Sequence, residues 1–443
     1  MKRTKKICTF LLVLTLIVTS LFCFGGCFDK NKDGLDGRDF DLFSAYTQLV
    51  ERGEFSGTYA EFVAQYLNVE VEWSENAALT TAINSSLAGS VSLKVVVEYT
   101  TSTGGIFGNQ GTKKTMARYG SGVIIDLDKE QGDAYILTNC HVIYDGAFVE
   151  DGVTYTPTST PTQYYAYLYG MGYEMYNDEY AIPLKVVGYS IENDIAVLKI
   201  DNSQILKNSL AQEAVFGNSD GILVGEQTYL VGNALGEGIA VTMGVVSVER
   251  EWVNVYAADG KTKLSLQSIR TDAAANYGNS GGGMYNQKGE LIGLLFAGYA
   301  EDGAQGINHV LPGNTVRGIA QSIIDHCSGN TVATKKVRLG VTVAMQSVRQ
   351  VFNSQTGKLG IEEVNVVKEV ASGSPAYNRF QVGDVLVSAT HNGKTVKIQR
   401  QWQLSDLLWQ VRAGDTVTFT VERGGAQVSL PVTFSSNDLV AVS

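Results

Sequence analysis

The feature that most constrains the fold of this chain is a run of small residues, DAAANYGNSGGGMY, at positions 272–285. It contains one serine, Ser280, with Gly278 two residues before it and glycines 281–283 after it. Glycine lets the backbone turn tightly around a single hydroxyl and leaves nearby main-chain N–H groups unobstructed. Such N–H groups can stabilise the oxyanion that forms when a hydroxyl attacks a carbonyl. The run therefore predicts a loop that presents Ser280 as a nucleophile.

Two other positions supply the partners that a serine nucleophile needs. His141 lies in the strand-like segment TNCHV, and Asp194 lies in NDIAVLKI. A histidine can take the proton of the serine, and an aspartate can hold the histidine in the right tautomer. The order His, Asp, Ser is one of the known chain orders of this triad. Each residue alone is also compatible with a structural role, so their joint occurrence is what favours catalysis.

These motifs resemble those of bacterial HtrA/Deg-type serine proteases, which consist of a trypsin-like domain followed by a PDZ domain. The resemblance spans roughly residues 90–325 and follows the order of motifs in that family. The matching segments are GSGVIID (120–126), LTNCHVI (137–143), VVGYSIENDIAVLKI (186–200), VGNALG (231–236), VTMGVVS (241–247), TDAAANYGNSGGGMYNQKGELIGL (271–294) and QGINHVLP (305–312).

The resemblance implies a mainly β fold, with a trypsin-like double β-barrel at residues 89–327. In such a domain Ser280 would attack a peptide carbonyl, His141 would transfer the proton, and Asp194 would orient the histidine. The N–H groups of Gly278 and Ser280 would form the oxyanion hole. The mechanism requires no metal and no cofactor.

Some positions depart from the family pattern. Gly283 stands where proline is usual, Tyr277 where proline or a small residue is common, and Asn193 where threonine or serine is usual. Glycine in place of proline predicts a looser segment after the nucleophile. His309 replaces a frequent phenylalanine on the strand that lines the primary specificity pocket, and Leu295 is the second candidate pocket residue. A buried His309 that faces away from the substrate is the alternative.

The segment after residue 327 resembles a PDZ domain. Residues 328–337 are polar and predict a linker, and residues 338–435 carry the PDZ-like segments RLGV and GDVLVSATHNGKTV. The resemblance implies a β-sandwich with short helices, including one near residues 403–411.

In a PDZ domain, the N–H groups of Leu339, Gly340 and Val341 would bind the terminal carboxylate of a peptide, which adds to the sheet as a strand. The insertion at residues 345–360 is expected to alter or cover that groove. A domain that only packs against the protease is the alternative.

Residues 1–26 have the pattern of an export signal, because MKRTKK is cationic and positions 7–24 are almost entirely apolar. The signal ends in FGGC, which resembles a lipobox and makes Cys27 the candidate for lipidation. An uncleaved membrane anchor and ordinary signal cleavage are the alternatives. The polar stretch 27–41 predicts a tether, and residues 42–88 predict a small helical module followed by linker or the leading segment of the protease domain.

Composition narrows the class of partner. The chain has 34 Lys and Arg against 45 Asp and Glu, a net charge of −11, which argues against nucleic acid. Beyond the N-terminal region the cysteines are Cys140 and Cys327, too few for a disulfide scaffold. Cys140 adjoins His141, and neighbouring strand residues point to opposite faces, so Cys140 is expected to fill core space.

A tyrosine-rich insertion at residues 144–182 is not predicted by the family pattern. We expect an elaborated hairpin whose rings pack on the first barrel, with a contact surface for a partner or substrate as the alternative.

Together these features predict a serine endopeptidase of protein quality control, anchored on the outer face of the cytoplasmic membrane of a Gram-positive bacterium. Its expected partners are unfolded or misfolded proteins and hydrophobic C-terminal peptides, and the family resemblance implies a homotrimer. A non-proteolytic chaperone or scaffold, and a protease that matures one surface protein, are the alternatives.

Overall fold

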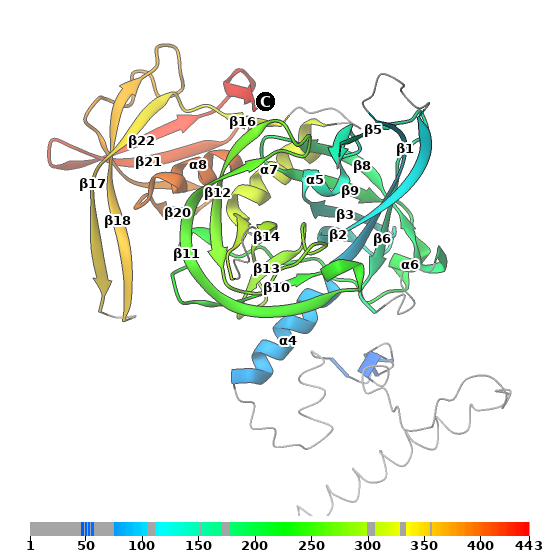
Figure 1. Ribbon diagram of the computed structural model, residues 1–443. Helices are drawn as coiled ribbons and strands as arrows, with labels where there is room; N and C mark the ends of the chain where they lie inside the picture. Colours follow the sequence, from blue (N-terminus) through cyan, green and yellow to red (C-terminus); the bar gives the residue numbers. More distant parts are fainter. Residues whose placement is uncertain are drawn as a thin grey trace, which may run out of the picture. The chain divides into compact units, whose positions relative to one another are not determined.

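Figure 1 shows the computed structural model of the chain. It describes residues 75–103, 111–150, 152–170, 178–298, 306–327, 334–354 and 357–442, with a few residues between 46 and 56. The chain divides into two compact units, Met1–Glu72 and Trp73–Ser443. The predicted export signal, Cys27 and the polar tether lie outside the described residues, as does most of the predicted helical module. Within the described ranges, no helix is both long and apolar enough to cross a membrane.

The first β domain is a nine-stranded antiparallel sheet in which the first strand pairs with three others. Its strands are β1 (Ser90–Thr103), β2 (Thr112–Asp128), β3 (Asp133–Thr138), β4 (Phe148–Glu150), β5 (Val153–Pro157), β6 (Gln163–Leu168), β7 (Ile182–Pro183), β8 (Lys185–Ser190) and β9 (Ile195–Ile200). The sequence of β9, IAVLKI, is almost continuously apolar, and its side chains are correspondingly buried. Short helices α5 (Cys140–Ile143) and α6 (Gln204–Lys207) follow β3 and β9.

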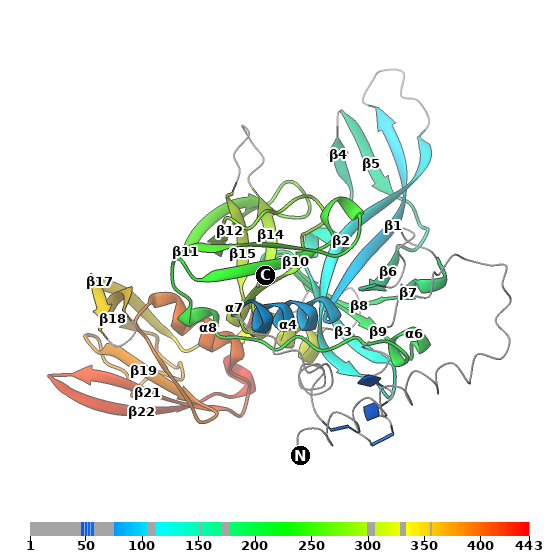
Figure 2. The same cartoon turned by 90° about the horizontal axis from the view of Figure 1, so that it is seen from below.

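Strands β4 to β7 belong to the tyrosine-rich insertion, and its described part is an elaborated hairpin on this sheet. Tyr155 stacks on Phe148 with ring centroids 4.6 Å apart, and the Tyr167 ring is also buried. Tyr169 and Tyr180 are exposed. Figure 2 shows β4 and β5 beside the outer half of β1, away from β3 and β9. Most of the described rings therefore pack, and two remain open to solvent.

The second β domain is a closed six-stranded antiparallel barrel. Its strands are β10 (Gln227–Gly232), β11 (Ala240–Tyr256), β12 (Lys263–Thr271), β13 (Gly283–Asn286), β14 (Leu291–Gly298) and β15 (Asn308–Pro312). Elsewhere among the described residues there are short 3₁₀ helices, η1 (Asp178–Tyr180), η2 (Ser219–Gly221), η3 (Ala234–Gly236) and η5 (Ser436–Asp438).

Helix α4 (Glu75–Ala88) precedes β1 in the region expected to be linker or a leading segment. The Ser86 hydroxyl lies 2.8 Å from the Tyr229 hydroxyl of β10, which ties the helix to the closed barrel. Gly289 permits a close approach on the same side, because a Cβ there would lie 3.2 Å from the carbonyl oxygen of Ala82. The helix is therefore packed against the second barrel.

Helix α7 (Gly313–His326) follows β15 and is amphipathic. Val316, Ile319, Ala320 and Ile323 recur every three or four residues and are buried, which is the spacing of one helix face. This face joins the core formed with both β domains.

The described part of the C-terminal domain contains a six-stranded sheet and one α-helix, α8 (Gln401–Gln410), close to the position expected from the sequence. The sheet strands are β17 (Val341–Asn353), β18 (Lys358–Val370), β19 (Val385–His391), β20 (Lys394–Lys397), β21 (Thr416–Arg423) and β22 (Ala426–Thr433). A separate pair joins β16 (Lys335–Val337) to β23 (Leu439–Ala441), so strand pairing continues past residue 435. The expected mainly β fold is confirmed.

Helix α8 packs directly on α7. A Cβ at Gly318 would lie 2.6 Å from the Cβ of Trp409, so the absence of a side chain there lets the helices approach. Arg250 of β11 forms buried ion pairs with Asp220 and with Asp406 of α8. The C-terminal domain is therefore joined to the second barrel by apolar and ionic contacts.

Candidate active site

Ser280 lies in the loop between β12 and β13, and two glycines give that loop its shape. Gly278 and Gly281 have φ angles of 92° and 82°, in the left-handed region that favours glycine. A Cβ would lie 2.3 Å from the Asn233 carbonyl oxygen at Gly278 and 2.2 Å from the Ser121 carbonyl oxygen at Gly281. Only glycine fits at either position, as the sequence pattern predicts.

The backbone N–H groups of this loop divide into two sets. Those of Asn279, Gly281 and Gly282 donate to backbone carbonyls at 2.9 to 3.1 Å. Those of Gly278 and Ser280 have no acceptor among the described residues. Two unpaired donors on either side of Asn279 are what an oxyanion site requires.

Ser121 of β2 holds the serine loop against the first β domain, a role that the sequence analysis missed. Its N–H donates to the Ser280 carbonyl at 2.9 Å, and its hydroxyl donates to the Gly278 carbonyl at 2.7 Å. The same hydroxyl accepts from the Asn233 N–H at 2.7 Å. Ser121 lies in the motif GSGV, but nothing in that motif shows that its partners are residues from the second barrel.

His141 and Asp194 meet because their strands pair. β3 ends three residues before His141, β9 begins directly after Asp194, and Thr138 lies opposite Ala196 in the antiparallel register. Asp194 accepts two hydrogen bonds from His141, from Nδ1 to Oδ2 at 2.8 Å and from the backbone N–H to Oδ1 at 2.9 Å. Asn139 also donates from Nδ2 to the Asp194 carbonyl at 2.9 Å.

The environment of this pair favours a basic imidazole. The Asp194 side chain is 9% exposed and the His141 side chain 34%, so the carboxylate lies behind a ring that solvent can reach. Burial of the ring opposes protonation, but the charge of Asp194 and its hydrogen bond outweigh burial and raise the pKa of His141. Within the described part of the chain, no hydrogen bond joins the His141 ring to the Ser280 hydroxyl.

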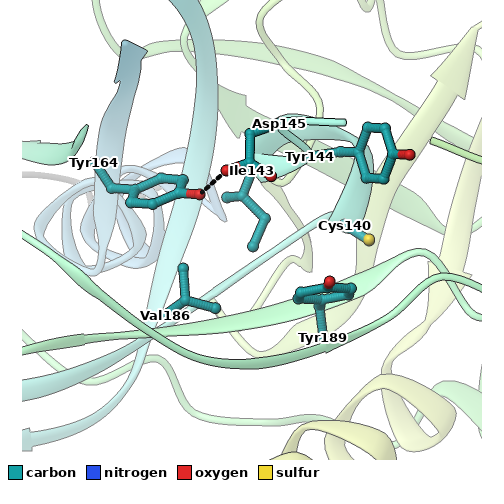
Figure 3. Close-up of a pocket in the computed structure, with 7 residues that line it drawn as sticks. All are labelled: Cys140, Ile143, Tyr144, Asp145, Tyr164, Val186 and Tyr189. Carbon is teal, nitrogen blue, oxygen red and sulfur yellow. Dashed lines mark hydrogen bonds between the residues drawn. The ribbon is translucent and has the colours of Figure 1, made fainter. Parts of the chain in front are cut away.

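Cys140, beside His141, is buried and not disulfide-bonded. Burial and the nearby charge of Asp194 raise the pKa of the Cys140 thiol strongly, which keeps it protonated and unreactive. Figure 3 shows it at the edge of a cavity of about 20 Å³, where the Tyr164 hydroxyl donates to Asp145 Oδ2 at 3.3 Å. The cavity is about the size of one water molecule. Cys140 therefore fills core space, as expected, although residues 140–143 form helix α5 and not the strand on which that expectation is based.

The departures from the family pattern have local explanations. A Cβ at Gly283 would lie 2.5 Å from the ring of Tyr285, which is fully buried, so the ring fills the space of the missing side chain. The expectation of a looser segment at Gly283 is therefore not supported by the packing. Tyr277 is exposed, and its carbonyl accepts from Leu235 N–H at 2.6 Å. Asn193 donates from Nδ2 to the Ser190 hydroxyl at 2.8 Å.

The two candidate pocket residues lie in different surroundings. Leu295 contacts the serine loop through its backbone, accepting from Gly281 N–H and donating to the Gly282 carbonyl, both at 2.9 Å. His309 is buried on β15, and its Nδ1 lies 3.2 Å from the Ser268 hydroxyl and 3.7 Å from Glu251 Oε1. Burial lowers the pKa of His309 although Glu251 opposes the shift.

A second candidate site lies in the C-terminal domain. Leu339, Gly340 and Val341 line an open groove of about 620 Å³ between the start of β17 and α8, where Leu404 and Leu408 form the apolar wall. The N–H groups of Leu339 and Gly340 have no acceptor in the described ranges. Two free donors at one end of an apolar groove suit the carboxylate of a peptide.

No group of three or more His, Cys, Asp or Glu side chains among the described residues is placed to hold a metal ion. The site chemistry rests on hydroxyl, imidazole, carboxylate and backbone amides.

The fold and the serine loop are those of a trypsin-like peptidase domain joined to a PDZ domain. Residues 120–294 match the family model of the trypsin-like peptidase domain, and residues 337–434 match that of the PDZ domain. The chain belongs to the HtrA/Deg-type family of serine proteases.

Two curated relatives illustrate the similarity. The chain is 30% identical over 341 residues to the serine protease Do-like HtrA of Bacillus subtilis, covering 74% of this chain and 66% of the relative. It is 29% identical over 334 residues to the periplasmic serine endoprotease DegP of Salmonella typhimurium, covering 68% of this chain and 60% of the relative. The match thus spans somewhat less than two thirds of each relative. A solved structure, the HtrA-type protease AlgW with tripeptide, is 25% identical, with a TM-score of 0.45 and coverage of 82% of this chain and 98% of that chain.

Proposed function

We propose that this chain is an extracytoplasmic serine endopeptidase that degrades misfolded or damaged exported proteins. The observation that carries the proposal is the combination of a doubly hydrogen-bonded Asp194–His141 pair with two unpaired N–H groups around Ser280. Few structural roles need both features in one loop cluster. The names of the relatives, a Do-like serine protease and a periplasmic endoprotease, support the same activity and an extracytoplasmic location.

In the proposed mechanism Ser280 Oγ attacks the scissile carbonyl while His141 Nε2 takes its proton. Asp194 keeps the proton of His141 on Nδ1, so that Nε2 is the free base, and stabilises the imidazolium that forms. The N–H groups of Gly278 and Ser280 bind the oxyanion, and each such donor contributes about 3 kcal/mol to transition-state stabilisation. His141 then gives its proton to the leaving amine, and water hydrolyses the acyl-enzyme by the same steps.

The PDZ domain is proposed to select the substrate. The groove beside Leu404 and Leu408 suits an apolar C-terminal residue, with the carboxylate on the N–H groups of Leu339 and Gly340. Misfolded exported proteins expose apolar segments and chain ends of this kind. The primary specificity pocket is proposed to include Leu295 and His309, because Leu295 adjoins the serine loop and β15 adjoins β14.

The N-terminal region is proposed to tether the protease to the outer face of the cytoplasmic membrane. The support is the cationic start, the apolar run at 7–24 and Cys27 after two glycines. The mass of the membrane-extracted protein tests this proposal, because a diacylglyceryl group on a chain that starts at Cys27 cannot arise from an uncleaved anchor. A homotrimer is proposed from the family resemblance, and sedimentation of the purified protein tests it.

The activity is tested by comparing the parent chain with Ser280→Ala on unfolded casein, with and without peptides that end in an apolar residue. Cys140→Ser is the matched control, because it removes the neighbouring thiol but leaves the proposed catalytic groups intact. We expect the parent and Cys140→Ser to cut casein and Ser280→Ala to be inactive. Stimulation by the peptides would support substrate selection by the PDZ domain.

One observation favours a second function, a non-proteolytic chaperone or scaffold. The described residues contain no hydrogen bond between the His141 ring and the Ser280 hydroxyl. Such bonds are often long in substrate-free proteases and tighten on binding, so the protease remains the better-supported function. If no variant cuts casein but all suppress aggregation of a denatured client, the chaperone function takes its place.

A third function, maturation of one surface protein, is favoured by the exposed Tyr169 and Tyr180 of the insertion. A profile of cut sites separates it from general degradation, since a processing protease would cut few sites and cut them in folded clients.

A further inference from the structure

The insertion at residues 345–360 does not cover the PDZ groove. It supplies β17 from Met345 onward and the start of β18, from Lys358 to Gly360. With the β18 residues up to Val364 that pair with it, it forms a two-stranded ribbon that extends beyond the other strands of the sheet (Figure 1). A register shift between Met345 and Ser347 marks the point where the ribbon leaves the body of the domain. None of the described residues of the insertion lines the groove.

The ribbon has one apolar face. Residues directly opposite one another in an antiparallel pair share a face, and alternate residues along a strand share a face. The pairs Val348–Glu363, Gln350–Ile361 and Phe352–Leu359 therefore lie on one side. The apolar members are exposed, at 56% for Val348, 67% for Phe352, 61% for Leu359 and 42% for Ile361.

The other face of the ribbon is polar near its middle. It carries Arg349 and Glu362, which form an ion pair at 2.8 Å. A ribbon with one charged and one apolar face in solvent has the pattern of a half-buried sheet whose covering partner is not part of the described chain.

The apolar face lies on the same side of the sheet as the groove. Glu363 shares that face, and it accepts from Arg400 Nε at 3.1 Å and from the Gln401 N–H at 2.7 Å, where α8 begins. Helix α8 thus starts on the apolar side of the ribbon, and its next turns supply Leu404 and Leu408 to the groove.

The groove and the ribbon also share one open edge. β17 pairs with β18 along one side and has no strand partner on the other among the described residues. A peptide whose carboxylate lies at Leu339 and Gly340 enters at the start of β17. Its preceding residues must then run antiparallel to β17, towards Asn353. The 13 residues of β17 therefore offer a free edge from the carboxylate site to the tip of the ribbon, with register shifts at Thr342–Val343 and Met345–Ser347.

We propose that the ribbon binds the apolar, extended segment that precedes the C-terminus of a client chain, as a continuation of the PDZ groove. The upstream backbone pairs with the free edge of β17, and alternate apolar side chains cover the face formed by Val348, Phe352, Leu359 and Ile361. This inference rests on the proposed role of the groove as a peptide site. It adds that the recognised chemistry is an alternating apolar segment that follows β17 well beyond the last few residues.

A second copy of the chain is a less suitable occupant. A stable dimer buries about 800 Å² on each partner. A face of four apolar side chains supplies only part of that area, whereas a client strand needs only the ribbon and its edge.

The test measures binding of two peptides to the full chain carrying Ser280→Ala, which prevents cleavage. Both peptides end in the same apolar residues. The short one fills only the groove, and the long one spans the 13 residues of β17 with apolar side chains at alternate upstream positions. We expect the long peptide to bind about 10-fold or more tightly than the short one, because it buries additional apolar surface.

The double variant Phe352→Ser and Leu359→Ser should abolish this gain without changing binding of the short peptide. Val351→Ser is the matched control, since Val351 lies on the opposite face of the same strand, and it should keep the gain. Thermal unfolding of each variant verifies that the fold is intact.

Three outcomes would overturn the inference: equal binding of the two peptides, a gain that survives the double variant, or a change of oligomeric state in that variant, which would identify a second copy as the occupant. If the short peptide fails to bind at all, the proposed groove itself is wrong, and the ribbon inference falls with it.

Discussion

Asp194 holds His141 by two hydrogen bonds at once, one to ring Nδ1 at 2.8 Å and one to the backbone N–H at 2.9 Å. The ring bond sets the tautomer and orients the imidazole, and the backbone bond fixes the start of α5 beside the carboxylate. The carboxylate reaches this position because it directly precedes β9, which pairs with β3. The pairing of two buried strands thus positions the proposed acid–base pair.

The first prediction concerns Asp194→Asn. The asparagine amide does not hold the proton of His141 on Nδ1 as the carboxylate does, so Nε2 is no longer kept as the free base. We therefore expect kcat/KM to fall about 10⁴-fold. Asp194 raises the pKa of His141 above its ordinary value of 6.5, and the base must be neutral, so parent activity is lost as pH falls through that raised pKa. In the variant this acid limb should move to lower pH. A pH profile of kcat/KM measures both effects.

The matched control for this prediction is Asp145→Asn, since Asp145 accepts hydrogen bonds from Thr162 and Tyr164 and, in the described structure, has none with His141. It should leave the profile unchanged. An Asp194→Asn variant with near-parental activity would contradict the proposed role of the pair.

The second prediction is that Gly283→Ala destabilises the protein. The added methyl would lie 2.5 Å from the Tyr285 ring, and overpacking of this kind costs about 1–3 kcal/mol. Gly360→Ala is the control, because its nearest neighbour beyond the adjoining residues, Val351 Cγ2, lies at an ordinary 3.6 Å. Denaturant unfolding should show a clear loss for Gly283→Ala alone. Equal stability of the two variants would show that the ring is free to move aside.

The sequence predicts most of the site because its signals are local. The glycines around Ser280 lie where the backbone approaches other residues too closely for any side chain. His141 follows β3 and Asp194 precedes β9, which are neighbouring strands of one sheet. The glycine run and the order of the motifs are visible in the sequence, but the carbonyl oxygens of Asn233 and Ser121 that make these glycines necessary are not. The geometry at Gly278 and Gly281 explains why the pattern is so specific.

The features that the sequence does not predict depend on distant partners. Ser121 acts through hydrogen bonds to residues of the second barrel. The ring of Tyr285 occupies the space beside Gly283, and the sequence alone does not reveal this contact. The sequence of α4 contains Asn, Ser and Thr, which have low helix propensity, so it is compatible with a linker. Its contact with Tyr229 of β10 shows that the segment is a packed helix that leads into the protease domain. The insertion at 345–360 has no regular alternation of polar and apolar residues, and only the register of β17 and β18 shows that one face is apolar.

The third prediction concerns the buried pair that joins the barrel to α8. Burial and the charge of Asp406 raise the pKa of Asp220 to about 7, although Arg250 opposes the shift. The folded protein therefore binds a proton that the unfolded chain, with an ordinary carboxyl pKa of 3.8, has already lost. This contribution to stability is complete below about pH 4 and is lost as pH rises towards 7.

Asp220→Asn should remove that pH dependence. We expect the difference in unfolding free energy between pH 5 and pH 8 to change by on the order of 1 kcal/mol or more. Asp325→Asn, at the more exposed ion pair with Arg412, is the control and should leave the profile close to that of the parent. An unchanged profile in Asp220→Asn would show that another group carries the dependence.

The fourth prediction is that Gln401→Ala tightens binding of short C-terminal peptides. Gln401 Nε2 donates to the Val343 carbonyl at 2.8 Å, on the β17 edge that a peptide would use. A peptide must displace this hydrogen bond, whose net contribution is about 0.5–1.5 kcal/mol, so its removal should lower Kd about 2- to 10-fold. Gln410→Ala, at the far end of α8, is the control. Weaker binding in Gln401→Ala would mean that the amide assists the peptide instead.

The central claim is that Ser280 is an activated nucleophile, and labelling with a fluorophosphonate tests it most directly. The reagent reacts with a serine only when a base and an oxyanion site are in place, and mass spectrometry locates the adduct. We predict a single adduct on Ser280 in the parent chain, retained in Cys140→Ser and lost in His141→Ala. Absence of an adduct on Ser280 in a folded parent chain, or equal labelling in His141→Ala, would contradict the account.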